Sequence, residues 1–115
     1  MDRNSYRDLI SKNEDELSEL KKEERLVNEQ RDALDAWKRQ ELAHADQMSY
    51  YFKGSDTAQD RRMLNKELAY IQEVCSKVDL ECKEQAGDIR GRQKQNLGQR
   101  DSIEGQYRAA QREEN

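Results

Sequence analysis

The sequence has no proline among its 115 residues, and it has only two cysteines, one tryptophan and one phenylalanine. Two cysteines are too few for a disulfide-stabilised scaffold, and an apolar fraction of 33% is small for an enzyme of this length that must enclose a pocket. No run of ~20 apolar residues is present, so we expect no transmembrane helix. Residues 1–15 contain no apolar segment, so we also expect no secretory signal peptide.

Charged residues are abundant and make up 40% of the chain. The 21 basic and 25 acidic residues leave a net charge of only −4, and this mixture of signs argues against a self-repelling disordered tail. About half of the residues are Ala, Glu, Lys, Leu, Arg or Gln, which are strong helix formers. The composition therefore predicts long helices that are largely exposed to water.

The first predicted helix covers residues 5–53, which neither glycine nor proline interrupts. Ser5 and Asp8 have the spacing of a capping box at its start. Apolar residues then recur at steps of three and seven, which indicates a heptad seam along one face. The seam residues expected to hold this helix in a hairpin are Leu17, Leu20, Val27, Leu34 and Met48.

Gly54 is the first glycine of the chain, and glycine is the preferred residue just beyond the end of a helix. It predicts a turn at 54–56 and a second helix over residues 56–112. Thr57 and Asp60 offer a further capping box that competes for the start of this helix.

The second predicted helix carries a more regular seam with steps of four and three residues. Its predicted hairpin residues are Leu64, Leu68, Ile71, Val78 and Ile89. Cys75 and Cys82 lie on the same seam and are interpreted as small buried thiols, because ~10.5 Å along one helix is too far for a disulfide. After Ile89 the seam divides into two lines of residues on neighbouring faces of the helix. The last third of the chain is therefore predicted to form a weaker coiled coil.

These two seams predict an all-α fold, an antiparallel two-helix hairpin that forms a single domain over residues 1–115. The register of such a hairpin places Leu34 near Cys75 and Leu20 near Ile89. Because one helix shields the seam of the other from one side only, we expect the isolated chain to be marginally stable. The alternatives are a continuous helix kinked at Gly54 and a multi-chain helical bundle, including a homodimer.

The sequence contains no motif that indicates catalysis, and we expect no enzyme activity, no cofactor and no metal site. His44 is the only histidine, and it lies in no recognisable motif. Carboxylates lie at helical spacing from lysine or arginine, as in solvated ion pairs. The basic run at 90–94 is offset by acidic neighbours in an acidic chain, so we expect no nucleic-acid binding.

Two features are candidates for contact with a protein partner. Glycines repeat every seven residues late in the chain, which indicates either a face where another helix approaches closely or a mobile end. Aromatic residues before the turn either close the end of the hairpin or anchor a partner. The predicted partner-binding residues are Tyr50, Tyr51, Phe52, Gly54, Gly91, Gly98, Gly105 and Tyr107.

The segment Phe52-Lys53-Gly54 resembles the Trp-x-Gly element at the turn of the small helical-hairpin proteins of type VII (ESX-type) secretion, with Phe52 in place of Trp. The chain is still more similar to the charged helical proteins encoded with LXG toxins in Gram-positive bacteria. The resemblance implies a cytoplasmic targeting factor that binds the helical N-terminal domain of such a toxin and either stays behind or is exported with it.

The family's C-terminal export signal, Tyr-x-x-x-Asp/Glu, is absent here, because Gln111 follows Tyr107 at the fourth position. The resemblance therefore implies that a second small helical protein supplies the signal. The residues leave two other functions open. One is a coiled-coil stalk protein of a type III or flagellar export ATPase, and the other is a homo-oligomeric structural coiled coil.

Overall fold

The computed structural model describes residues 1–52 and 57–114, and among these it contains helices and no strand. Helix α1 spans Arg3–Tyr51 and helix α2 spans Ala58–Glu114. Helix α1 thus begins two residues earlier than predicted, and α2 ends two residues later. The predicted turn at 54–56, with Gly54, lies outside the described residues. Neither described helix has a stretch that is both long enough and apolar enough to cross a membrane.

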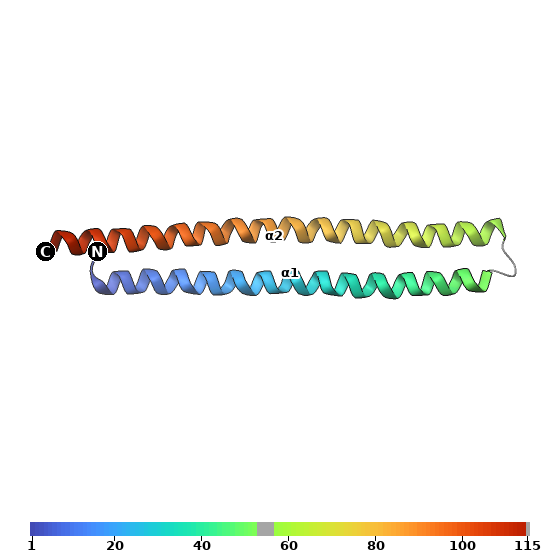
Figure 1. The fold of residues 1–115 in the computed structure, drawn as a ribbon, viewed down its shortest axis with the longest axis horizontal. Helices are drawn as coiled ribbons and strands as arrows, with labels where there is room; N and C mark the ends of the chain where they lie inside the picture. The colour runs from blue at the N-terminus through green and yellow to red at the C-terminus, as the bar shows by residue number, and fades with distance from the viewer. Residues whose placement is uncertain (53–56, 115) are drawn as a thin grey trace. The chain divides into compact units, whose positions relative to one another are not determined.

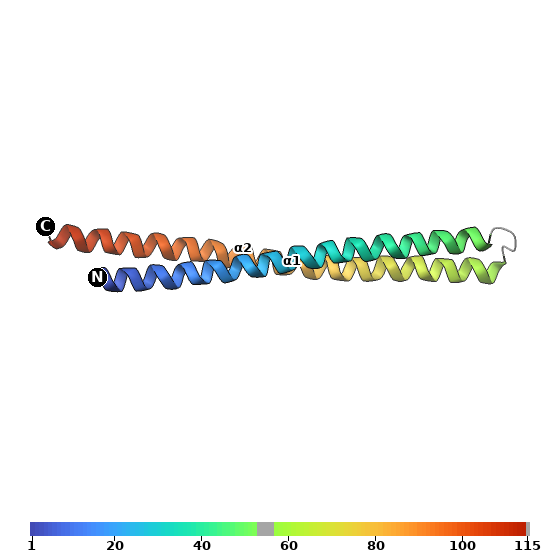
Figure 2. The ribbon, with the colours of Figure 1, turned by 90° about the horizontal axis from the view of Figure 1, so that it is seen from below.

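The chain divides into two compact units, and each contains a segment of both helices. Unit 1 combines Met1–Leu26 with Gln85–Asn115, and unit 2 is Val27–Glu84. Within each unit the segments of α1 and α2 lie side by side and run in opposite directions in both views (Figure 1 and Figure 2). The predicted all-α helical hairpin is therefore confirmed.

Side-chain caps set the starts of both helices. The carboxylate of Asp2 accepts a hydrogen bond of 2.7 Å from the backbone N–H of Ser5, and this bond lowers the pKa of Asp2. The predicted capping box of Ser5 and Asp8 is therefore wrong, because Ser5 is already inside the helix. At α2 the Thr57 hydroxyl accepts a bond of 3.1 Å from the N–H of Asp60, as the competing box predicts.

Unit 1 has a narrow core that contains both apolar and amide side chains. Leu20 is fully buried, and Ile89 is 4% exposed. Asn13 and Asn96 are also buried, and the side-chain amide of each donates to the backbone carbonyl of the other at 2.9 Å. Leu20 follows Asn13 by seven residues, and Ile89 precedes Asn96 by seven. Because the helices are antiparallel, the contact between the two asparagines sets Leu20 opposite Ile89. The periodicity of the sequence predicts the same pairing.

Unit 2 is held by a short apolar core, and an ion pair joins its two helices. Its buried apolar residues are Val27, Ala45, Ile71 and Cys82. Cys75 is half-buried, and both cysteines are free thiols. Arg31 of α1 lies 3.9 Å from Asp79 of α2, and Lys83 lies 2.8 Å from the same carboxylate. The hydrogen bond from Lys83, with smaller contributions from the charges of Lys83 and Arg31, lowers the pKa of Asp79.

The predicted seam residues are placed at the helix interface with one exception. Those that are buried or half-buried are Leu17, Leu20, Val27, Leu34, Met48, Leu64, Ile71, Val78 and Ile89. Leu68 departs from the prediction, because it is 40% exposed while Glu67 is half-buried. The seam steps by three from Leu64 to Glu67 and then by four to Ile71, so Leu68 flanks it.

The last third of α2 continues as helix to Glu114. Both lines of residues that diverge after Ile89 are buried or half-buried: Gln93, Arg100 and Tyr107 in one, and Asn96, Ile103 and Ala110 in the other. Polar contacts join this segment to α1, since Arg92 lies 2.8 Å from Glu23 and Arg100 lies 3.5 Å from Glu14. Hydrogen bonds and ion pairs therefore replace much of the apolar burial here.

Candidate partner-binding surfaces

The aromatic residues before the turn differ in exposure. Tyr50 is 75% exposed and Tyr51 is 81% exposed at the end of α1, whereas Phe52 is half-buried. Gly54, which belongs to the same predicted surface, lies outside the described residues. The two tyrosine rings are therefore accessible to another protein, and each combines an apolar ring with a hydroxyl that can hydrogen-bond.

The three glycines of the predicted stripe lie on the exposed surface of α2. A Cβ atom added at Gly91, Gly98 or Gly105 would meet no other atom within 4 Å. The packing of this hairpin therefore does not require glycine at these positions, although each costs the helix ~1 kcal/mol relative to alanine. Gly98 follows the buried Asn96 by two residues, which turns it about 200° round the helix and away from α1.

Tyr107 is part of the hairpin's own interface. Its ring stacks on that of Tyr6, with ring centroids 4.1 Å apart and an interplanar angle of 14°. Both rings are half-buried. The prediction that Tyr107 binds a partner is corrected on this point, because its position on one of the two seam lines turns the ring towards α1.

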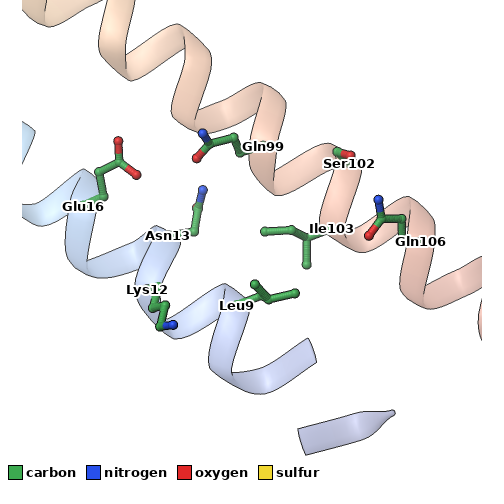
Figure 3. Close-up of a pocket in the computed structure, with 8 residues that line it drawn as sticks. All are labelled: Leu9, Lys12, Asn13, Glu16, Gln99, Ser102, Ile103 and Gln106. Carbon is green, nitrogen blue, oxygen red and sulfur yellow. The ribbon is translucent and has the colours of Figure 1, made fainter. Parts of the chain in front are cut away.

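Unit 1 has a groove of about 370 Å³ between its two helices. Leu9 of α1 and Ile103 of α2 point towards each other across it (Figure 3). Its lining residues are Leu9, Lys12, Asn13, Glu16, Gln99, Ser102, Ile103 and Gln106. The α2 wall carries no charge, and two of its glutamines directly follow Gly98 and Gly105 in the sequence. An uncharged strip in a chain that is 40% charged is suited to close contact with another helix.

Unit 2 has a larger groove, with a volume of about 590 Å³. The residues that line it are Leu34, Asp35, Lys38, Leu42, Leu68, Ile71, Gln72, Cys75, Ser76 and Asp79. Leu42 of α1 is 41% exposed, and Leu68 of α2 is 40% exposed. Leu68, which the periodicity assigns to the seam, thus lines a groove open to a third helix.

Large apolar side chains are more often exposed than buried in the described residues. The core holds six apolar residues, whereas eleven large apolar ones are exposed. These are Met1, Leu9, Leu26, Leu42, Tyr50, Tyr51, Met63, Leu68, Tyr70, Leu80 and Leu97. Single exposed apolar residues are ordinary on any protein surface, but here they outnumber the core, and five of the eleven line a groove or lie at the end of α1.

Sequence periodicity alone did not reveal either groove. Leu9 and Leu42 lie off the predicted seam, and their positions beside Ile103 and Leu68 depend on the register of the two helices. An apolar residue one position outside a heptad seam is the sequence signal for the side of such a groove.

Comparisons of the chain with protein-family models, with curated proteins and with solved structures find no match.

Proposed function

We propose that this chain is a non-enzymatic helical adaptor that binds a helix of another protein in the groove of unit 2. The observation that carries the proposal is the excess of exposed over buried large apolar side chains. An amphipathic helix placed in this groove would cover Leu42 and Leu68 and would widen the core around Ile71. Full burial of a leucine contributes about 1.5–3 kcal/mol, so covering several half-exposed ones is a substantial gain for a hairpin with so small a core.

The proposed partner is the helical N-terminal domain of a type VII-secreted LXG toxin. This finer identification is supported by the resemblance of Phe52-Lys53-Gly54 to the Trp-x-Gly element. The exposed rings of Tyr50 and Tyr51 next to that element offer anchors for a partner. In this role the chain would act in the cytoplasm as a chaperone-like targeting factor, and a second small helical protein would supply the export signal.

Affinity purification of the tagged chain from its native host, followed by mass spectrometry, tests the identity of the partner. We expect enrichment of a large protein with a helical LXG-type N-terminal domain and of a second small helical protein. Enrichment of an export ATPase would contradict the toxin role and indicate the stalk function. Recovery of the chain alone would contradict the adaptor role and indicate a self-assembling coiled coil.

The groove can be tested in the same purification with charged variants. Leu42→Glu and Leu68→Glu place a carboxylate in the groove, and we expect each to abolish recovery of the partner because burying an unpaired charge is costly. Leu26→Glu is the matched control, because Leu26 is 58% exposed and lines neither groove. Equal loss of the partner in the control would contradict a specific role for the groove.

The glycine stripe makes a separate prediction. Gly98→Ala and Gly98→Leu should keep or increase the helicity of the isolated chain, since a Cβ added at Gly98 meets no neighbour and both residues favour helix. If a helix of the partner packs closely against Gly98, affinity for the partner should be highest with glycine, lower with alanine and lowest with leucine at this position. Circular dichroism and a binding titration measure the two effects, and unchanged affinity for Gly98→Leu would exclude the stripe from the interface.

A further inference from the structure

Three side chains from the two helices of unit 2 converge on one another. Glu41 and His44 belong to α1, and Glu67 belongs to α2. A ligand atom from each, an imidazole nitrogen and one oxygen of each carboxylate, lies within 4.8 Å of the other two. The two glutamates are half-buried and His44 is exposed. None of the three lines either groove, so this cluster is distinct from the surfaces described above.

The fold brings these residues together for identifiable reasons. Glu41 and His44 are three residues apart and therefore lie on the same face of α1. Glu67 occupies the seam step that the sequence pattern gave to Leu68, so its side chain reaches α1. Trp37 and Tyr70 make an edge-to-face contact at 6.3 Å between ring centroids. Trp37 precedes Glu41 by four residues, and Tyr70 follows Glu67 by three. The aromatic pair therefore lies about one helical turn from the cluster.

The charges of the cluster are not balanced by basic side chains. Two carboxylates that face the opposite helix in unit 1 are paired with arginine, Glu14 with Arg100 and Glu23 with Arg92, whereas that of Glu24 accepts a hydrogen bond from Gln93. No such pair involves Glu41 or Glu67 among the described residues. Two carboxylates held this close repel each other, and a cation bound between them would offset that repulsion. Their placement in the seam therefore favours a bound cation.

We propose that Glu41, His44 and Glu67 bind one Zn²⁺ ion and thereby join α1 to α2. Imidazole nitrogen and carboxylate oxygen are both zinc ligands, whereas Ca²⁺ and Mg²⁺ prefer sites made of oxygen alone. Ligands at ~2.0 Å from a tetrahedral ion are ~3.3 Å apart, which modest side-chain rotations can reach from the observed separations. Three protein ligands leave the fourth position to water or to a group from another molecule.

Zinc titration of the purified, metal-free full-length chain tests this site by calorimetry and by thermal unfolding. We expect one Zn²⁺ ion per chain and an unfolding midpoint that rises with zinc concentration, because the ion binds only the folded arrangement. His44→Ala and Glu67→Gln should each weaken zinc binding by about tenfold or more. Glu29→Gln, which changes an exposed carboxylate of the same unit, is the matched control and should bind zinc like the unchanged chain.

Glu67→Gln also separates the site from a failure to fold. Because this substitution removes a repulsion between carboxylates, its unfolding midpoint without zinc should equal or exceed that of the unchanged chain, while the rise with zinc is lost. The proposal is overturned if the unchanged chain shows no zinc binding or if His44→Ala binds zinc unchanged, which would point to other donors such as Cys75 and Cys82. Equal binding of Ca²⁺ would also overturn it, because that result indicates a simple acidic patch.

Discussion

At the scale of single residues, the Asn13–Asn96 pair is the most specific contact between the helices. Each side-chain amide donates to the backbone of the opposite helix, but the Oδ1 atom of each is buried and has no partner. A buried polar atom without a partner costs about 1–3 kcal/mol. Asparagine within a helical seam is a known means of fixing register and the number of chains, at a cost in stability. We infer that this pair selects one alignment of α1 against α2.

The double substitution Asn13→Leu with Asn96→Leu should therefore raise the thermal midpoint and relax the alignment. Leucine branches at Cγ as asparagine does, and the substitutions remove both unpaired oxygen atoms. Melting followed by circular dichroism reports stability, and light scattering after gel filtration reports additional oligomeric species. Asn28→Leu, at an exposed position of α1, is the control. A midpoint below that of the unchanged chain would show that the two amide hydrogen bonds outweigh the cost of the unpaired atoms.

At the scale of the helices, the heptad pattern was sufficient to predict two helices, their pairing and most of the seam. It could not decide between Glu67 and Leu68, because steps of three and four residues both continue a helical stripe. Only the packed register shows that Glu67 enters the seam. The same limitation hid the contact of Tyr107 with Tyr6 and the approach of Glu67 to His44, since both depend on residues far apart in the sequence.

Helix ends were predicted less well, because several residues near each start can serve as a cap. Asp2 and not Ser5 caps α1, and both patterns are equally plausible from the sequence. Thr57→Ala should lower the free energy of unfolding by ~1 kcal/mol, because it removes the hydroxyl that accepts from Asp60. Urea unfolding followed by circular dichroism measures this change. Ser5→Ala should have little effect, and a comparable loss there would contradict the assignment of Asp2 as the cap.

At the scale of the whole molecule, each unit depends on very few buried side chains. Domains are typically stable by only about 5–15 kcal/mol, and here six buried apolar residues serve both units. Because so little apolar surface is buried within the chain, its stability should respond strongly to changes in the core and to anything that covers the exposed residues. Under the proposed adaptor function, partner binding and folding would then be linked.

Comparing Leu20→Ala with Leu26→Ala tests this link within one segment of α1. Leu20 is fully buried, so its truncation should cost about 2–5 kcal/mol and remove much of the helicity of the isolated chain at 37 °C. Leu26 is 58% exposed, so its truncation should change stability by less than about 0.5 kcal/mol. If folding and binding are coupled, saturating partner should restore the helicity of Leu20→Ala, because a ligand that binds only the folded state shifts the equilibrium towards it. Circular dichroism with and without the partner measures both effects, and a Leu20→Ala chain that stays unfolded in excess partner would contradict the coupling.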